Sequence, residues 1–247
     1  MRGRIARRLS IALLMLANAK MAQAACLDPT EFMQSTVNIA RQFDNEERGT
    51  HGDVVAIRGT GWFLSSTTIV TAQHVAHAMN LSSTGWKPLE IVDGRRNKQL
   101  LEARIQRIAG AQAEKLAVIE LQRAFPAARS FEIRTEPLLP EEQVTAFSYQ
   151  AGGLRPVQGR FVRVGNDGRL AGMALLELND GSNRLVIDHG ASGAPVVDCD
   201  GRVAAVVSNV FTQSISGMSR EIRISTPWGS PNVASIPVES LNDALPN

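Results

Sequence analysis

The sequence predicts an all-β protein that contains two antiparallel six-stranded β-barrels and a short C-terminal helix. Two sets of short runs rich in Val, Ile, Leu and Phe, mostly bounded by Gly, Ser, Thr or Asp, indicate the strands. Four Asp-Gly pairs lie between such runs, and this dipeptide is typical of a type I′ hairpin turn. A stretch with three prolines separates the two sets and favours a surface linker. Together these patterns predict two barrels of similar size.

The first predicted barrel covers residues 51–125. It follows an N-terminal arm at 25–50, in which residues 29–43 show a helical pattern. The strands of this barrel are expected at 53–58, 61–64, 67–71, 89–92, 101–108 and 116–121.

The second predicted barrel covers residues 143–247 and follows the proline-containing linker at 126–142. Pro237 is well placed as the first residue of a C-terminal helix that continues to Leu245. The strands of the second barrel are expected at 144–149, 158–164, 173–178, 184–188, 195–199 and 202–208.

Residues 1–24 contain the three regions of a secretory signal peptide. Four arginines lie within the first eight residues, a mostly apolar run follows at 9–19, and Ala22 and Ala24 are the small residues that a signal peptidase requires. A transmembrane anchor is the alternative, but this run is shorter than the roughly 20 residues that span a bilayer. No other apolar stretch of the sequence is long enough to span. We therefore expect a secreted or periplasmic protein with no stable membrane insertion.

Removal of the signal peptide changes the charge balance. Residues 1–24 carry five basic side chains and no acidic ones, so the formal net charge changes from +2 to −3. This balance gives no support to nucleic-acid binding. The basic cluster at 95–98 follows Asp93 and Gly94 and is interpreted as a solvated turn. We expect peptide or protein partners and no nucleic acid.

The sequence contains two cysteines, Cys26 and Cys199. In an oxidising compartment we expect them to form one disulfide that ties the mature N-terminus to a site late in the chain. A lipid on Cys26 is an alternative, because this residue lies close behind the signal peptide. Lipoprotein signals usually have an aliphatic residue three positions before the cysteine, where this chain has Gln23. Two free thiols are a further alternative, which the compartment disfavours.

His74 is the first candidate catalytic residue. It follows the strand-like run 67–71 closely. A strand that ends there and turns at once places His74 on a tight turn at a barrel rim, held rigidly and open to a cleft. A lone histidine is also common as a surface or core residue, so this segment alone leaves both roles open.

Ser192 is the second candidate and has a glycine on each side within two residues. Gly190 and Gly193 let the backbone approach a substrate closely and adopt conformations that other residues resist. The amide groups of Gly190 and Ser192 can then converge on one point, as the binding of an oxyanion requires. A plain glycine-rich turn is the alternative, since the spacing differs from the Gly-x-Ser-x-Gly motif of the α/β-hydrolases.

Together and in this order, the two segments resemble those of the trypsin-like (chymotrypsin-fold) serine peptidases, in particular the bacterial secreted members. The histidine block is Gly59-Thr60-Gly61-Trp62-Phe63 with Thr71-Ala72-Gln73-His74, and the serine block is Gly190-Ala191-Ser192-Gly193-Ala194-Pro195. The resemblance covers residues 50–240. It implies that Ser192 is the nucleophile, that His74 is the general base, and that the amides of Gly190 and Ser192 form the oxyanion hole.

The same resemblance implies a substrate cleft. Residues 205–208, which end at Ser208, are similar to the strand that lines the family's cleft. Val186 lies six residues before Ser192, at the position that floors the primary specificity pocket in the family. This implies an apolar or small side chain before the scissile bond. His189 is expected at the cleft rim.

The third member of the catalytic triad departs from the family pattern. The acidic block of the family typically reads Asp followed by a strand like Leu-Ala-Val-Ile, but here Lys115 precedes residues 116–119. A cation at this place disfavours the imidazolium that His74 must form. Glu114 is the candidate acid, but neighbouring side chains on a strand point to opposite faces, so it reaches the site only across a bulge. We therefore expect Lys115→Asp to raise activity and Glu114→Gln to change little.

The histidines do not predict a metal site. His74 and His77 are three residues apart, but His51 and His189 do not form a second pair with ligand spacing. A metal site would also leave the serine block unexplained. We expect no metal and no cofactor.

Two functions from different classes fit these observations. One is a secreted trypsin-like serine endopeptidase that uses a Ser-His pair with an atypical third triad position. The other is a catalytically impaired pseudoprotease that binds peptides or proteins in the same cleft. The intact His74, Ser192 and glycine pair favour the enzyme, whereas Lys115 favours the pseudoprotease.

Overall fold

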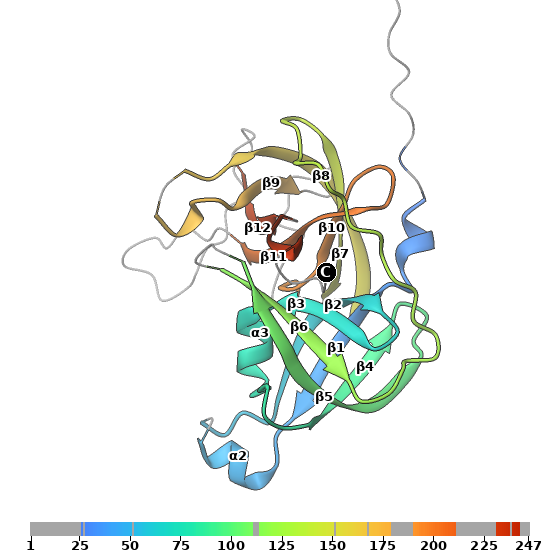
Figure 1. Cartoon of the computed structure of the whole chain (residues 1–247), viewed down its shortest axis with the longest axis vertical. Helices are drawn as coiled ribbons and strands as arrows, with labels where there is room; N and C mark the ends of the chain where they lie inside the picture. The colour runs from blue at the N-terminus through green and yellow to red at the C-terminus, as the bar shows by residue number, and fades with distance from the viewer. Residues whose placement is uncertain are drawn as a thin grey trace, which may run out of the picture.

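The described residues form two closed six-stranded β-barrels, one above the other in Figure 1. Neighbouring strands in both barrels run antiparallel, so the predicted all-β architecture is confirmed. The computed structural model describes residues 26, 28–50, 52–110, 114–150, 152–166, 168–178, 190–210, 231–237 and 239–242. The predicted signal peptide at 1–24 lies outside these residues.

The first barrel has the strand order β1-β2-β3-β6-β5-β4. Alternate side chains of its strands, such as Ile39, Phe63 and Ile119, point inward and form its apolar core. The short helix α2 (Asn45–Thr50) follows β1, and α3 (Gln73–Ala78) follows β3. The strands are β1 (Thr36–Gln42), β2 (Ala56–Ser65), β3 (Thr68–Ala72), β4 (Lys87–Asp93), β5 (Lys98–Ala109) and β6 (Leu116–Leu121).

The second barrel has the strand order β10-β11-β12-β9-β8-β7. Its strands are β7 (Gln143–Gln150), β8 (Gly153–Val164), β9 (Ala174–Leu178), β10 (Pro195–Val197), β11 (Val203–Val210) and β12 (Val233–Pro237). The 3-10 helix η2 (Gly168–Leu170) precedes β9, and α4 (Glu239–Asn242) follows β12. No helix among the described residues is both long and apolar enough to cross a membrane.

Several sequence-based boundaries were wrong. The predicted helix at 29–43 is a single 3-10 turn, η1 (Pro29–Phe32), followed by β1, which pairs with β2 and β4. The first barrel therefore begins before residue 51, and its strand count includes β1, because the predicted strands 53–58 and 61–64 are one strand, β2. Pro237 ends β12, and α4 begins at Glu239. The predicted strand at 184–188 lies outside the described residues, and β12 was not predicted.

Two of the four Asp-Gly pairs are fully described, and neither forms the predicted type I′ turn. After β4, the carbonyl of Asp93 accepts from the amide of Arg96, and Arg96 has the positive φ of 68°. Gly94 is needed for close approach instead, because a Cβ there would lie 2.2 Å from a carbonyl oxygen of the N-terminal segment. Between β10 and β11, Asp198 repeats the role of Asp93 and Gly201 takes the positive φ of 80°.

An aromatic cluster joins the two barrels. Trp62 of the first barrel meets Phe131 of the linker edge-on, with ring centroids 6.1 Å apart. Phe131 lies in turn 6.4 Å from Phe147 of the second barrel. All three side chains are at least nine-tenths buried. This shared core fixes the position of one barrel against the other, and with it any site built from both.

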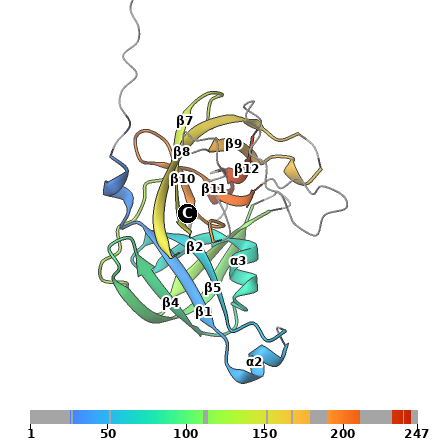
Figure 2. The same cartoon turned by 180° about the vertical axis from the view of Figure 1, so that it is seen from behind.

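The segment before β1 contacts both barrels. Figure 2 shows it in blue, passing along the second barrel before it enters the first as β1. The ring of Phe32 stacks on Phe131 at 5.9 Å and lies 6.0 Å from Phe147. The carbonyl of Met33 accepts a hydrogen bond from the amide of Gly94 in the first barrel. The segment therefore completes the interface between the barrels.

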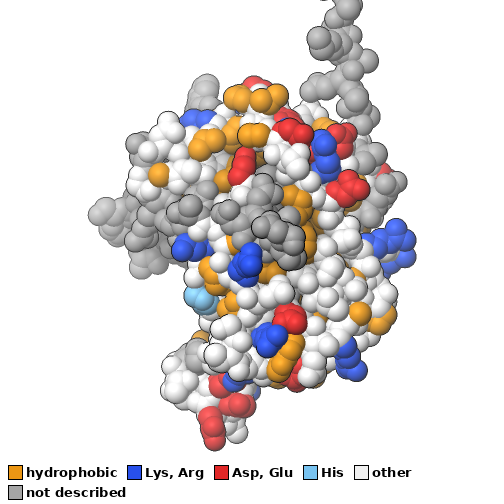
Figure 3. All heavy atoms as spheres, in the orientation of Figure 1, with side chains coloured by type: hydrophobic (Ala, Val, Ile, Leu, Met, Phe, Trp, Pro, Cys, Tyr) orange, Lys and Arg blue, Asp and Glu red, His pale blue; other side chains and the backbone are white. Residues whose placement is uncertain are grey.

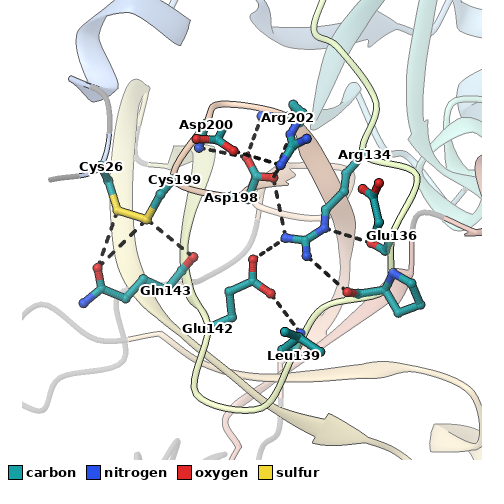
Figure 4. A network of polar contacts seen from close by, with 11 residues as sticks. Cys26, Arg134, Glu136, Leu139, Glu142, Gln143, Asp198, Cys199, Asp200 and Arg202 are labelled. Atoms are coloured by element: carbon teal, nitrogen blue, oxygen red, sulfur yellow. Dashed lines mark hydrogen bonds and ion pairs between the residues drawn. A yellow bond between two sulfur atoms is a disulfide. The ribbon is translucent and has the colours of Figure 1, made fainter. Parts of the chain in front are cut away.

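A disulfide joins Cys26 to Cys199, which confirms the predicted pairing. Next to it, Arg134 of the linker is largely buried and pairs with Glu142 and with Asp198, whose carboxylate lies 3.5 Å away (Figure 4). The carboxylate of Asp198 also accepts from Arg202 at 3.0 Å. These contacts fasten the N-terminal segment and the linker to the turn between β10 and β11.

Candidate active site

His74 lies where β3 ends and α3 begins. The pairing of β3 with β6 brings Ala72 opposite Leu116. One residue further on, the amide of Gln73 donates to the carbonyl of Lys115 at 2.8 Å. In an antiparallel pair, each step forward on one strand matches a step backward on the other. The next pair in this register is His74 and Glu114.

The carboxylate of Glu114 is adjacent to the imidazole of His74. Its Oε2 lies 3.4 Å from Nδ1 of His74. The same oxygen accepts a hydrogen bond of 3.1 Å from the hydroxyl of Ser208, on β11 of the second barrel. Glu114 thus bridges the two barrels at the histidine.

The expectation that Glu114 reaches His74 only across a β-bulge was wrong. The alternation of side chains applies within a strand, but β6 begins at Leu116, so Glu114 and Lys115 precede it. No bulge is needed for the Glu114 carboxylate to reach His74. Lys115 contributes its backbone carbonyl to the contact with Gln73. The expectation that Lys115 occupies the place of the acid does not fit this arrangement.

Ser192 lies at a corner of a tight turn. The amide of Ala194 donates to the carbonyl of Ala191 at 2.9 Å, which closes a four-residue turn with Ser192 and Gly193 in the middle. Gly193 has φ of 89°, a conformation that only glycine adopts readily at this position of a type II turn. Its amide donates to the carbonyl of Val207 at 2.8 Å, so the turn is anchored to β11.

Thr60 of β2 holds this turn against the first barrel. Its amide donates to the carbonyl of Ser192 at 3.1 Å. Its hydroxyl donates to the carbonyl of Gly190 at 2.6 Å and accepts from the amide of Tyr149 at 3.0 Å. Thr60 is fully buried, and Thr71 donates in turn to its carbonyl at 2.7 Å. In the sequence, Thr60 is recognisable only as part of the histidine block, because these contacts join residues far apart in the chain.

The hydroxyl of Ser192 donates to the backbone carbonyl of Ser208 at 3.1 Å. No hydrogen bond joins Ser192 to His74 within the described part of the chain. Ser208 therefore contacts both halves of the site, since its carbonyl accepts from Ser192 and its hydroxyl donates to Glu114. The resemblance placed Ser208 in the substrate cleft, and in the structure its polar contacts include these two site residues.

The histidine side is open to solvent. The side chain of His74 is 43% exposed and that of Glu114 is 30% exposed. Figure 3 shows histidine atoms at the surface on the side of the first barrel where α3 lies. No group of three or more potential metal ligands occurs among the described residues. Val186, His189 and His51 lie outside the described residues, so the predicted specificity pocket and cleft rim have no structural description.

Comparison with known proteins gives one family. The trypsin-like peptidase domain matches residues 59–206, a region that contains the histidine, the glutamate and the serine of the site. No curated protein sequence matches the chain.

Among the solved structures that share the fold are two forms of one protease. The active form of the Rv3671c protease from M. tuberculosis has a TM-score of 0.55 and 15% sequence identity, over 89% of this chain and 88% of that chain. The inactive form of Rv3671c, crystallised as a serine-to-alanine mutant, has a TM-score of 0.53 and 15% identity, over 86% of this chain and 85% of that chain. At this level of identity the likeness concerns the fold alone.

Proposed function

The chain belongs to the trypsin-like peptidase domain family, which gives it a serine-protease-type function, and we propose that it is a secreted endopeptidase with Ser192 as nucleophile. His74 is the general base, and Glu114 is the acid that orients it. One observation carries this proposal. A continuous set of contacts runs from His74 through Glu114 and Ser208 to Ser192, across both barrels.

The proposed reaction begins when the hydroxyl of Ser192 turns from the Ser208 carbonyl to Nε2 of His74. Such contacts are often absent from a free enzyme and form in the complex with substrate. Ser192 Oγ then bonds to the carbonyl carbon of the scissile peptide while its proton passes to His74. The electrons of the carbonyl π bond move to its oxygen. The amides of Gly190 and Ser192 donate to this oxyanion.

The second half of the reaction releases the two products. His74 returns the proton to the leaving amine as the C–N bond breaks, which leaves an acyl group on Ser192. A water molecule then loses a proton to His74 as its oxygen bonds to the acyl carbon. The bond between this carbon and Ser192 Oγ breaks, and His74 gives the proton to Oγ, which releases the acid product and restores the hydroxyl. No step requires a group other than protein residues and water.

Glu114 supports both steps by its position. A carboxylate beside Nδ1 accepts a hydrogen bond from the Nδ1–H group, so that Nε2 carries no proton and can act as the base. The carboxylate also stabilises the imidazolium that forms. The hydroxyl of Ser208 donates to the same oxygen and limits where the carboxylate can move. Ser208 is therefore a positioning residue in this proposal.

The expected substrates are peptides or proteins, in keeping with the family. We propose Val186 as the floor of the pocket for the side chain before the scissile bond, with a preference for apolar or small residues, and His189 at the rim. Secretion is proposed from the signal-like residues 1–24. The disulfide between Cys26 and Cys199 supports it, because disulfides persist in oxidising compartments.

Labelling with a serine-directed fluorophosphonate tests the proposed function. We expect intact-mass spectrometry to find one adduct on the folded protein, and peptide mapping to assign it to Ser192. Ser192→Ala should remove the label, and His74→Ala should slow it strongly, because the base no longer takes the proton.

The pseudoprotease is the second candidate. It is favoured by the hydrogen bond that the Ser192 hydroxyl donates to the Ser208 carbonyl and not to His74. No adduct after long exposure, on protein whose thermal unfolding shows it to be folded, would establish this alternative and exclude the proposed enzyme.

A further inference from the structure

We propose that Arg58 makes the leaving-group side of the cleft selective for substrates with an acidic side chain at the second position after the scissile bond. This inference rests on the proposed function and names a substrate class for the same site. Arg58 lies near the beginning of β2, two residues before Thr60, which contacts the serine turn.

The register of β2 brings Arg58 close to the site. Thr60, two residues further along β2, contacts both Ser192 and Gly190. Residues two apart on a strand point to the same face and lie about 7 Å from each other. The side chain of Arg58 therefore leaves β2 on the face that Thr60 turns toward the serine turn. Gly59, between Arg58 and Thr60, packs against Val75, the residue after His74, since a Cβ on Gly59 would lie 2.5 Å from the Val75 side chain.

The strand order shows on which side of His74 this arginine lies. β3 leads into His74 and is flanked by β2 and β6 in the first barrel. Glu114 precedes β6 and contacts His74 from that side. Arg58 belongs to β2 and lies on the opposite side. The two charged residues therefore border the histidine from different directions.

The acyl side of a bound peptide lies along β11. The pairing of β11 with β10 ends at Val206, and the carbonyl of Val207 accepts from the serine turn. Beyond this point no described strand pairs with that edge of β11. An extended peptide can add to such an edge by backbone hydrogen bonds. The residues before the scissile bond then follow Ser208 and Asn209.

The leaving-group side must lie across Ser192 from β11. The groups on that side are Thr60, the carbonyl of Tyr149 and, further along β2, Arg58. A Cβ on Gly190 would lie 2.7 Å from the Tyr149 carbonyl, so the serine turn packs closely against this wall. A peptide that leaves the site in this direction passes the face of β2 that carries Arg58.

The charge of Arg58 is available to a ligand. Arg58 is exposed and makes no ion pair or hydrogen bond with any described side chain. Ala40 of β1 pairs with Arg58 of β2 on one side and with Glu90 of β4 on the other. Glu90 therefore lies on the same outer face of the barrel as Arg58, two strands away. The carboxylate of Glu90 is already paired with Lys98 at 2.7 Å. An Asp or Glu of the substrate is then the partner that Arg58 can bind without losing an existing contact.

Matched peptides test this preference. The protein first digests a peptide library, and mass spectrometry of the products identifies one sequence that it cleaves. Two versions of it, with Glu or Gln at the second position after the scissile bond, are then compared. We expect kcat/KM to be about three- to fivefold higher for the Glu peptide, the size of an exposed ion pair. The preference should shrink in 0.5 M salt, where the Debye length falls to a few ångströms.

Charge reversal assigns the preference to Arg58. Arg58→Glu should make the Gln peptide the better substrate, and Arg58→Gln should make the two peptides equal. Arg123→Glu is the matched control. Arg123 is also exposed and has no described partner, but it follows the C-terminal end of β6, whereas Glu114 precedes the strand. Arg123→Glu should keep the wild-type ratio. Equal kcat/KM for the two peptides in the wild type, or a ratio that Arg58→Glu leaves unchanged, overturns the inference.

Failure of the proposed function gives a different result. In that case no peptide is cleaved and Ser192 is not labelled. The inference is then decided by binding, with the library passed over immobilised Ser192→Ala protein. Enrichment of Asp- and Glu-containing peptides that Arg58→Glu abolishes and Arg123→Glu keeps supports it. Binding without such enrichment, or no binding, overturns it.

Discussion

The carboxylate of Glu114 lies 3.4 Å from Nδ1 of His74, although a lysine separates Glu114 from the strand that follows. The contact depends on the pairing of β3 with β6, which sets the residue after Ala72 beside the residue before Leu116. Strand register therefore positions the acid, and the identity of residue 115 affects it little.

Glu114→Gln is the direct test of this acid. We expect kcat for a cleaved peptide to fall about a hundred- to a thousandfold, because an amide can hold the imidazole in the wrong tautomer. This is less than the roughly ten-thousandfold loss at a buried triad acid, since both side chains here are partly exposed. Glu120→Gln is the matched control, because Glu120 lies on β6 and is bound to Arg104 at the surface.

Lys115→Asp separates the two alignments of this segment. With Glu114 already beside His74, a new carboxylate at 115 should change kcat by less than about threefold, the scale of a surface charge effect. A large gain in activity from Lys115→Asp, together with an unaffected Glu114→Gln variant, would show that the alignment made from the sequence was correct and this one wrong.

The site residues that are recognisable from their neighbours in the sequence could be predicted. Those that are placed by the register between paired strands could not. The glycine-flanked Ser192 and the strand-ending His74 have recognisable neighbours in the sequence. Glu114 could be assigned only once the start of β6 was known, because side-chain alternation holds within the strand and not before it. Thr60 and the hydroxyl of Ser208 act through contacts between residues far apart in the chain.

The missed strand β1 has a similar physical cause. Its inward-facing positions are Val37, Ile39 and Arg41, so the apolar alternation is interrupted by a charge. Arg41 is only 2% exposed because Glu47 neutralises it, with guanidinium-to-carboxylate distances of 2.5 and 2.7 Å. Because a buried arginine counts as polar, the alternation of apolar and polar residues that predicts a strand is not recognisable in this segment.

Ser208→Ala tests the proposed positioning role. The substitution removes the hydroxyl that donates to Glu114 but keeps the backbone carbonyl that accepts from Ser192. We expect kcat to fall about tenfold, the equivalent of one hydrogen bond to a charged group, with KM nearly unchanged. Ser235→Ala is the control, since Ser235 is also buried in a strand of the second barrel and its hydroxyl has no partner among the described residues. Equal effects of the two variants would argue for a purely structural role.

Glu47 gives a pH-dependent contribution to stability. Burial alone raises the pKa of Glu47, but hydrogen bonds from Arg41 and Lys87 outweigh it and lower the pKa to about 2. A lowered pKa means that the stabilisation is complete above the ordinary value of 4.5 and is lost as the pH falls through about 2. Glu47→Gln should cost about 3 kcal/mol at pH 7, because it leaves the buried Arg41 without its counterion.

Urea unfolding of wild type and Glu47→Gln between pH 2 and pH 7 measures this contribution. The difference in unfolding free energy between wild type and Glu47→Gln should be constant above about pH 4.5 and should shrink as the pH falls toward 2. Glu46→Gln, one residue earlier on α2 and exposed without a described partner, should match the wild type at every pH. A Glu47→Gln difference that stays constant down to pH 2 would contradict the ionic origin of the effect.

Gly193→Ala tests whether the turn geometry at Ser192 is required for reaction. Gly193 has φ of 89°, and a Cβ there would lie 2.1 Å from both the carbonyl oxygen of Thr60 and the hydroxyl of Thr71. Neither atom can retreat easily, because Thr71 donates to that same carbonyl and Thr60 donates to Ser192. The turn must shift instead. We expect fluorophosphonate labelling to slow by about a hundredfold or more, the effect of a displacement near 1 Å in a reacting group.

Gly152→Ala is the matched control for this strain. Gly152 also has a positive φ, 81°, but a Cβ there meets no heavy atom within 4 Å. Its substitution should cost about 1 kcal/mol of stability from the backbone conformation alone and leave the labelling rate close to that of the wild type. Urea midpoints and labelling rates of both variants separate the two effects. If Gly193→Ala labels as fast as Gly152→Ala, the close packing of the serine turn against Thr60 and Thr71 is not what holds Ser192 in position.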